Sequence, residues 1–397
     1  MTSSRAHDRG LGLLAAAAAL GVANLYYAQP LAALMASSLA ISASAIGSCL
    51  TACQLGYALA MLLLVPLGDG RERRGLMVQT ALATSISALL VAVAPNLWLL
   101  LIANLLLGFC SCLPQMCVPF AVALVPPERR GAAIGTVMSG LLTGILLSRT
   151  ASGVLASLIG WRGTFTGAAL LMAVLASCLR LRLPPQHPRE PLPWSRIVRS
   201  LPGVLRSQPL LIKHGLIGAL GFASFSVFWS TLSFQLAALG HGASTAGLYG
   251  VLGIAGIAVA GVVGRRAESW GPPRVNAVGL VSLALSFVVA AGAPGSLLAL
   301  AVAAVLLDAG MQASHLANQT VIFGLAPELR NRLNAIYMVL FFIGGSLGTA
   351  MASLAWQLAR WPGVCVAGAA FALCGLLPVA FGPARLRAPE PRSESHG

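Results

Sequence analysis

The chain has 397 residues, of which 57% are hydrophobic and only 9% are charged. Soluble domains contain about 25% charged residues, so this composition excludes an ordinary soluble protein and predicts a polytopic membrane protein. The net charge of +15 does not indicate nucleic-acid binding, because the arginines lie in short loops between apolar segments. The sequence contains no metal-ligand set, nucleophile elbow or phosphate-binding loop. We therefore expect neither an enzyme nor a bound cofactor.

Twelve apolar segments are long enough to cross a bilayer as helices, which takes about 20 residues. They cover residues 11–35, 43–67, 76–94, 97–124, 131–159, 163–181, 211–238, 244–263, 275–292, 296–325, 333–358 and 362–381. A linker rich in proline and arginine (183–208) separates an N-terminal half (1–182) from a C-terminal half (209–382), and a tail follows (383–397). We predict an all-α membrane protein with 12 transmembrane helices in two six-helix halves.

The first apolar segment belongs to the mature protein. It is too long for the hydrophobic core of a signal peptide and contains several polar residues, so we interpret it as a retained span. The eight cysteines all fall inside apolar segments and do not have zinc-site spacing, so we interpret them as packing residues.

The basic residues predict the orientation. With the N-terminus in the cytoplasm, all but three of the 25 lysines and arginines fall on the cytoplasmic side, as the positive-inside rule requires. Arg162 and Arg360 fall outside, and Arg149 falls within the fifth span. Both termini are therefore expected in the cytoplasm.

The two halves repeat one another. The loop PPERRG (126–131) aligns with APELRN (326–331) at an offset of 200, and the same offset pairs Trp161 with Trp361. A parallel repeat of six spans joined by a cytoplasmic linker is typical of transporters that bind their substrate between the halves at mid-membrane.

The tenth span carries a polar stripe. Asp308, Gln312, His315 and Gln319 are spaced four, three and four residues apart, which places them on one helix face. An acid at the centre of a lone membrane helix costs about 2.5–3.5 kcal/mol on insertion scales, and Asp308 is the one carboxylate that we place at membrane depth. The stripe either forms hydrogen bonds between helices, worth about 0.6 kcal/mol each, or lines a polar cavity. An acid among four aligned groups favours the cavity.

The first and fourth spans contain further candidates for the cavity. Asn24 and Tyr27 are three residues apart, and Gln29 follows just before a proline. These residues either pack around a proline kink or line the cavity. In the fourth span, Asn104 and Gln115 are eleven residues apart and share a face. At the offset of 200, Gln115 corresponds to a member of the polar stripe.

Candidate residues in the fifth and seventh spans can each be interpreted in two ways. Arg149 lies about 27 Å along its helix from Gly131. It either extends to the membrane interface or pairs with a carboxylate or an anionic substrate in the cavity. Phe225 and Trp229 follow helical spacing in the seventh span. They either contact other helices and lipid or line the cavity, where they would favour a flat or greasy substrate.

Two motifs resemble the major facilitator superfamily, and the likeness extends over nearly the whole chain. They are N-L-Y-Y-A-Q-P (24–30) and V-P-L-G-D followed by a basic run (65–74). The resemblance is to bacterial members of the drug/proton-antiporter type. It implies that spans one, four, seven and ten surround the substrate and that the two halves rock about it.

The basic loop matches the family pattern G-x-x-x-D-R-x-G-R-R in part. Asp69, Arg73 and Arg74 match, whereas Gly70 and Glu72 replace the family's first arginine and its second glycine. In the family, the matching aspartate and arginines latch the cytoplasmic side of the outward-facing state. The resemblance therefore implies a cytoplasmic gate at these three residues.

Two other departures from the family pattern concern residues linked to proton coupling. Asn104 stands where many members have an arginine, and Ile145 follows Gly144 where proton antiporters have a proline. The proton-antiporter signature is therefore incomplete.

From these features we predict a transporter of the bacterial inner membrane that works as a monomer by alternating access. The lead hypothesis is proton-coupled export of small amphipathic or hydrophobic compounds, with Asp308 as the coupling acid and His315 and Arg149 as modulators. The alternative is a carrier of a polar metabolite, such as a sugar or small organic acid, which the amides of the cavity favour. A membrane enzyme or receptor is disfavoured, because no soluble output domain is present.

Overall fold

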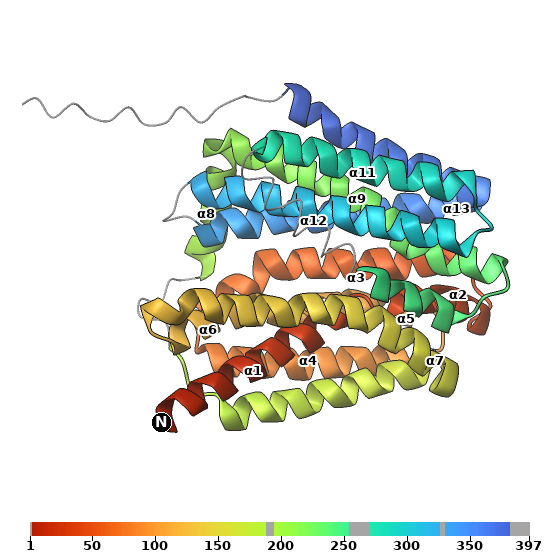
Figure 1. Ribbon diagram of the computed structural model, residues 1–397. Helices are drawn as coiled ribbons and strands as arrows, with labels where there is room; N and C mark the ends of the chain where they lie inside the picture. Colours follow the sequence, from red (N-terminus) through yellow and green to blue (C-terminus); the bar gives the residue numbers. More distant parts are fainter. Residues whose placement is uncertain (1, 188–193, 254–269, 326–329, 382–397) are drawn as a thin grey trace, which may run out of the picture.

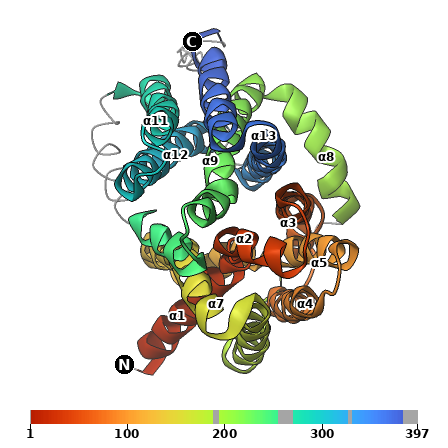
Figure 2. The same cartoon turned by 90° about the vertical axis from the view of Figure 1, so that its right-hand side faces the viewer.

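The computed structural model describes residues 2–187, 194–253, 270–325 and 330–381, and this part of the chain is helical. The long helices run along a common direction in a bundle (Figure 1). Seen from one end, the helices of the C-terminal half (α9, α11, α12 and α13) form one group and those of the N-terminal half form the other (Figure 2). The predicted all-α fold of two halves is confirmed.

The helices follow the predicted spans closely. Their bounds are α1 Thr2–Ala23, α2 Ala28–Ser38, α3 Ala43–Leu63, η1 Val65–Asp69, α4 Arg73–Val93, α5 Leu97–Cys110, α6 Leu113–Leu124, η2 Pro127–Arg129, α7 Arg130–Arg182, α8 Trp194–Ser207, α9 Pro209–Ala238, α11 Pro272–Gly292, α12 Leu297–Leu325 and α13 Arg330–Phe381.

Within these described residues, nine helical segments are long and apolar enough to cross a membrane. Two of them, containing α7 and α13, are pairs of spans that meet at a kink, at Gly160 (φ +71°) and at Ala359–Arg360. Counting each pair as two gives eleven spans. The remaining predicted span, 244–263, is helical over 243–253, and its other residues lie outside the described part of the chain.

Two spans that we predicted as continuous are interrupted. The first breaks between α1 and α2, and the fourth breaks between α5 and α6. Proline explains the second break: Pro114 has no backbone N–H, so the carbonyl of Cys110 loses its helical partner. That carbonyl instead accepts a hydrogen bond from Oγ1 of Thr84 at 2.8 Å. Pro30 follows the first break in the same way.

The two halves share local structure at the offset of 200. Residues 34–50 and 234–250 have the same succession of buried, half-buried and exposed positions. Two residues after the last residue of each helix before the turn, the backbone has positive φ, at Ala40 (+51°) and Gly240 (+83°). Asn96 and Ser296 each cap the helix that follows by accepting a hydrogen bond from the backbone N–H three residues on.

The halves touch closely at the end of the bundle remote from the N-terminus. Oγ1 of Thr150 on α7 donates to the carbonyl of Gly247 at 2.9 Å. Gly153, one turn further, lies against the same helix: a Cβ there would lie 2.5 Å from the carbonyl oxygen of Ala243 and 2.8 Å from the Cα of Gly247. Ser44 at the start of α3 hydrogen-bonds Gln357 of α13. In the predicted orientation, this closed end is the extracellular one.

Replacing Gly153 by leucine should hold this end open, because the added side chain would overlap the backbone of residues 243–247. Spin labels on residues 42 and 242, in a background without native cysteines, should then be further apart than in the parent protein. Gly167→Leu is the matched control, since a Cβ at Gly167 meets nothing within 4 Å. Equal distances between the spin labels in both variants would show that the close contact at Gly153 does not keep this end closed.

Candidate functional site

Arg149 of α7 is buried inside the bundle, with 1% of its surface exposed. Its Nε donates a hydrogen bond to Oε1 of Gln29 on α2 at 2.8 Å. Its guanidinium carbon lies 4.0 Å from the ring centre of Trp229, 4.8 Å from that of Tyr26 and 5.6 Å from that of Phe225. Aromatic faces attract a cation at these distances. Arg149 therefore lies in the interior, not at the membrane interface, and both halves surround it.

Asp308 of α12 is also buried, with 6% of its surface exposed. It lies beside Arg149 against the helix over 243–253, where a Cβ on Gly250 would lie 2.8 Å from the Cβ of Arg149. The helix over 243–253 covers the carboxylate, since a Cβ on Gly253 would lie 3.1 Å from Oδ2 of Asp308. Among the described residues, three buried polar atoms at this place have no hydrogen-bond partner: Oδ2 of Asp308, Nη2 of Arg149 and Nε1 of Trp229. Such atoms are costly unless a ligand, water or proton satisfies them.

We call this group the Arg149 cluster. It consists of Tyr26, Gln29, Arg149, Phe225, Trp229 and Asp308. Tyr26, Gln29 and Arg149 belong to the N-terminal half, and the other three belong to the C-terminal half. The cluster thus places opposite charges on the two parts that alternating access would move.

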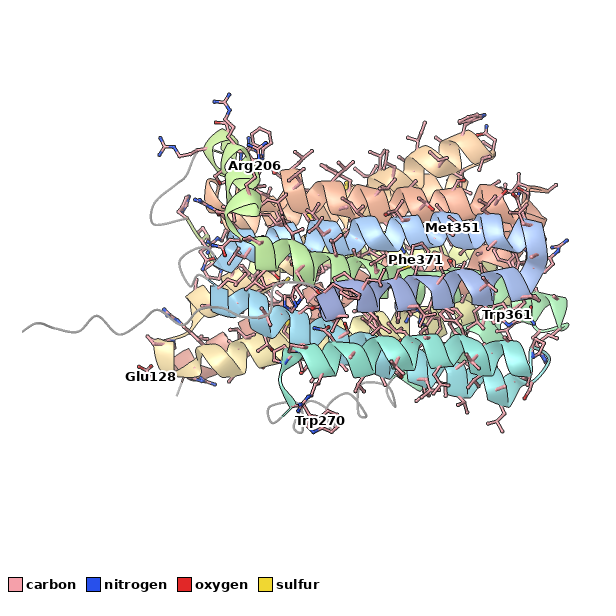
Figure 3. The ribbon with its side chains drawn as sticks, turned by 90° about the horizontal axis from the view of Figure 1, so that it is seen from above. Glu128, Arg206, Trp270, Met351, Trp361 and Phe371 are labelled. Atoms are coloured by element: carbon pink, nitrogen blue, oxygen red, sulfur yellow. The ribbon has the colours of Figure 1, made fainter. Side chains whose placement is uncertain are left out.

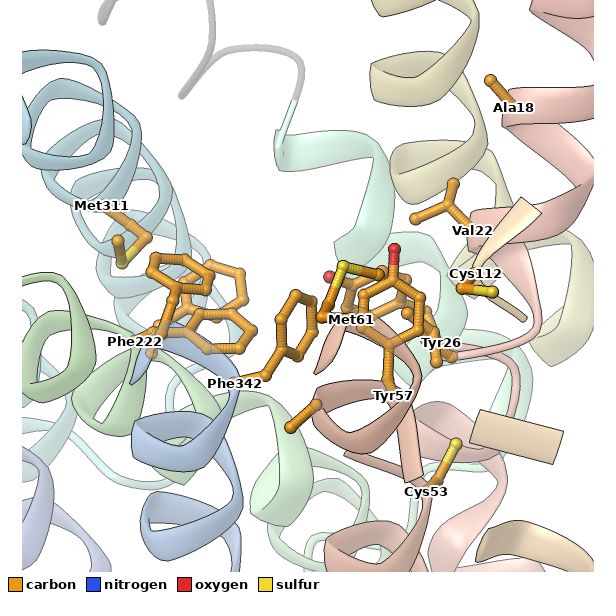
Figure 4. Packing of buried hydrophobic residues seen from close by; sticks show 14 of the residues in the cluster. Ala18, Val22, Tyr26, Cys53, Tyr57, Met61, Cys112, Phe222, Met311 and Phe342 are labelled. Atoms are coloured by element: carbon orange, nitrogen blue, oxygen red, sulfur yellow. The ribbon is translucent and has the colours of Figure 1, made fainter. Parts of the chain in front are cut away.

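An aromatic group joins the halves beside the cluster. Tyr57 of α3 and Phe342 of α13 have ring centres 4.4 Å apart. Phe222 of α9 packs against Phe342 at 5.3 Å and against Phe341 at 4.0 Å, and Figure 4 shows Phe342 between Phe222 and Tyr57. Gln115 of α6 donates a hydrogen bond from Nε2 to the Tyr57 hydroxyl at 3.2 Å. A half-buried amide therefore adjoins these rings.

The other members of the polar stripe lie on a common face of α12. Gln312, His315 and Gln319 are half-buried, whereas Leu316 on another face is exposed. The stripe therefore does not lie on the outermost face of the bundle. His315 interacts within the C-terminal half: its Nδ1 lies 2.9 Å from the hydroxyl of Tyr337.

Besides Gln115, Gln312 and Gln319, three more predicted cavity residues lie outside the cluster and have contacts inside the N-terminal half. The ring of Tyr27 packs edge-on against Phe165 inside the N-terminal half, with ring centres 6.5 Å apart. Asn24 and Asn104 each donate a hydrogen bond to a carbonyl of their own helix, at 2.8 Å. The helix break before α2 changes the register, so Tyr26 and not Tyr27 reaches Arg149. The proline at position 30 was the sequence signal for this break.

The C-terminal half also contains a buried polar network that was not predicted from the sequence. Nδ1 of His214 lies 2.7 Å from Oδ1 of Asn318, which also accepts a hydrogen bond from Nδ2 of Asn276 at 3.0 Å. Ser314 donates to Oδ1 of Asn276 at 2.7 Å. These residues link α9, α11 and α12. At the offset of 200, His214 and Asn318 correspond to leucine and valine, so the network belongs to one half.

The basic loop is held within the N-terminal half. Glu72 caps α4 by accepting hydrogen bonds from the backbone N–H groups of Arg74 (2.8 Å) and Gly75 (2.7 Å). It also accepts one from the N–H of Gln186 at 2.9 Å. Nη1 of Arg74 donates to the carbonyl of Leu183 at 3.1 Å, and Nε of Arg73 donates to that of Gly68 at 3.1 Å. In this conformation these bonds join the loop to the end of α7.

The cytoplasmic gate at Asp69, Arg73 and Arg74 stays a prediction. Arg73 and Arg74 make the bonds described above, and the side chain of Asp69 lies outside the described part of the chain. Glu72, which replaces a glycine of the family pattern, is the residue that organises the loop.

The two repeated halves and the charged interface between them define a helical membrane transporter. A family model described as Major Facilitator Superfamily matches residues 11–349, and the chain belongs to that family. The uncharacterized transporter YgaY of Escherichia coli O157:H7 is 41% identical over 367 residues, which are 92% of this chain and 93% of YgaY.

Two further comparisons are more distant. The multidrug resistance protein MdtG of Escherichia coli K12 (DH10B) is 30% identical over 139 residues, 34% of each chain. A crystal structure of a bacterial homologue of the human lysosomal transporter Spinster, inward-facing and unoccupied, has a TM-score of 0.72. It is 17% identical and covers 95% of this chain and 94% of its own. This likeness shows the shared fold.

Replacing Arg149 by methionine should destabilise the protein, because it leaves the Asp308 carboxylate buried without its counter-charge. The expected decrease in the free energy of unfolding is on the order of 1–3 kcal/mol. The double variant Arg149→Met/Asp308→Asn should recover part of it. Thermal unfolding of both single variants and the double variant in detergent measures the coupling. Additive losses would contradict an interaction between the two charges.

Glu72 should make the stability depend on pH. Burial raises the pKa of this carboxyl, but its three backbone hydrogen bonds and the nearby Arg74 outweigh burial and lower the pKa below its ordinary value. The ionised Glu72 carboxylate therefore stabilises the folded protein fully above the ordinary glutamate pKa of about 4.3. This stabilisation is lost as the pH falls through the lowered pKa of the folded state. The parent protein should have a higher thermal unfolding midpoint than Glu72→Gln, and this difference should become smaller below about pH 4. A difference that does not change with pH would argue against the capping role.

Proposed function

We propose that the protein is a proton-coupled exporter of small amphipathic compounds that works by alternating access. The observation that carries this proposal is the Arg149 cluster, in which a buried cation of one half faces a buried acid of the other. Asp308 is the proposed coupling acid, Arg149 is its fixed counter-charge, and His315 modulates the site.

Protonation of Asp308 would change the attraction between the halves. Arginine keeps its proton in proteins, so the carboxylate is the member of the pair that can gain or lose charge. When it binds a proton, the attraction across the interface disappears. A proton that stabilises one arrangement of the halves more than the other shifts their populations. The proton gradient can drive transport in this way.

The aromatic residues support an amphipathic substrate. Phe225, Trp229 and the rings around Phe222 offer flat apolar surfaces next to the charges. Sites for such compounds combine apolar walls with a few polar groups. The partial similarity to MdtG, whose name denotes multidrug resistance, agrees with export.

The alternative substrate is a polar metabolite such as a sugar or small organic acid. The amides of Gln115, Gln312 and Gln319 favour it, because each offers both a hydrogen-bond donor and an acceptor. A drug-sensitivity panel on cells with and without the protein separates the two substrate classes. Protection against hydrophobic compounds supports the exporter, and an unchanged panel supports the metabolite carrier.

The setting in the cell is part of the proposal. We propose that the protein works in the bacterial inner membrane as a monomer, with both termini in the cytoplasm. The distribution of lysine and arginine supports this orientation.

Asp308→Asn should abolish proton-coupled transport and leave the protein folded in the membrane. The measurement uses purified protein in liposomes with an internal pH-sensitive dye, an imposed pH gradient and a mixed compound library. Compound-evoked proton movement should be present in the parent protein and lost in Asp308→Asn. Ser286→Ala is the control, since Ser286 is buried on α11 and bonds its own helix. Compound flux without proton movement in the parent would disprove proton coupling.

A further inference from the structure

The linker helix α8 lies across one end of the bundle and contacts both halves. Nε1 of Trp194 at its start donates a hydrogen bond to the carbonyl of Leu63, the last residue of α3, at 2.8 Å. The helix also packs against α9 and α13 of the C-terminal half. Figure 2 shows α8 along the outer edge of the bundle, bridging the two groups of helices.

The helix has two distinct faces. Leu201 and Val204 are buried in the main apolar core of the protein. Arg196, Arg199 and Arg206 are exposed and are spaced three and seven residues apart, which places them on one side. The helix contains no acidic residue. Figure 3 shows Arg206 at the margin of the bundle, pointing away from it.

The depth of α8 in the membrane follows from its neighbours. Its first residue bonds the end of a membrane-spanning helix, α3, and its last residue is followed within two positions by the start of another, α9. The helix therefore lies at the level where membrane spans end, which is the level of lipid headgroups. Trp194 is 40% exposed there, and tryptophan is enriched at this interface.

We propose that the arginine face of α8 binds the headgroups of anionic phospholipids in the adjacent leaflet. The apolar face already packs against protein, so the outer face contributes charge and not apolar burial. Three arginines in one row complement a layer of phosphate groups, and the cytoplasmic leaflet is the one that carries anionic lipid. Because α8 contacts both halves, bound lipid would act on the element that joins them. This proposal is independent of the substrate and of proton coupling.

The test compares lipid binding by the parent protein and the triple variant Arg196→Gln/Arg199→Gln/Arg206→Gln. Native mass spectrometry from mixed micelles of palmitoyl-oleoyl phosphatidylglycerol and phosphatidylcholine counts the lipids that each protein retains. The parent should retain phosphatidylglycerol selectively. Each arginine contributes about a fivefold preference, so the triple variant should lose on the order of 100-fold.

The matched control changes three exposed arginines off α8 at the same end of the bundle: Arg71, Arg130 and Arg274, each to glutamine. It removes the same charge, so equal losses in both triple variants would overturn the proposal by showing a non-specific attraction. Retention of phosphatidylglycerol by the α8 variant would overturn it too. A variant with lysine at the three α8 positions should keep the preference, and its thermal midpoint in neutral detergent checks that the fold is intact.

Discussion

The structure depends on a buried arginine that two halves of the molecule must satisfy together. A guanidinium inside a membrane protein is tolerated when hydrogen bonds and counter-charges replace its hydration. Gln29 provides one hydrogen bond, three aromatic rings provide their negative faces, and Asp308 provides the opposite charge. Neither half could bury these groups alone, so the interface and the site are the same feature. Transporters built from two repeats generally bind their substrates at the interface between the repeats.

Much of the fold could be predicted from the sequence. The apolar segments gave helix ends within a few residues, because bilayer thickness fixes their length. The repeat at an offset of 200 appears in the structure as matched turns at Ala40 and Gly240 and matched caps at Asn96 and Ser296. These features are local, and local residues determine them.

The candidate site was less predictable, because its geometry depends on contacts between distant segments. The sequence leaves the position of Arg149 open, since an arginine at that depth can extend to the interface or pair inside. The choice between Tyr26 and Tyr27 depended on a helix break that changes the register before Pro30. The network of His214, Asn276 and Asn318 joins three helices, and no spacing within one helix could have indicated it.

The interrupted helices have a mechanical consequence. The first and fourth spans are each broken near mid-length, whereas their counterparts α9 and α12 are continuous. The C-terminal half also has hydrogen bonds that tie α9, α11 and α12 to one another. The two halves are therefore unequal in stiffness. We expect single helices to bend mainly in the N-terminal half, whereas the C-terminal half should move as a rigid body.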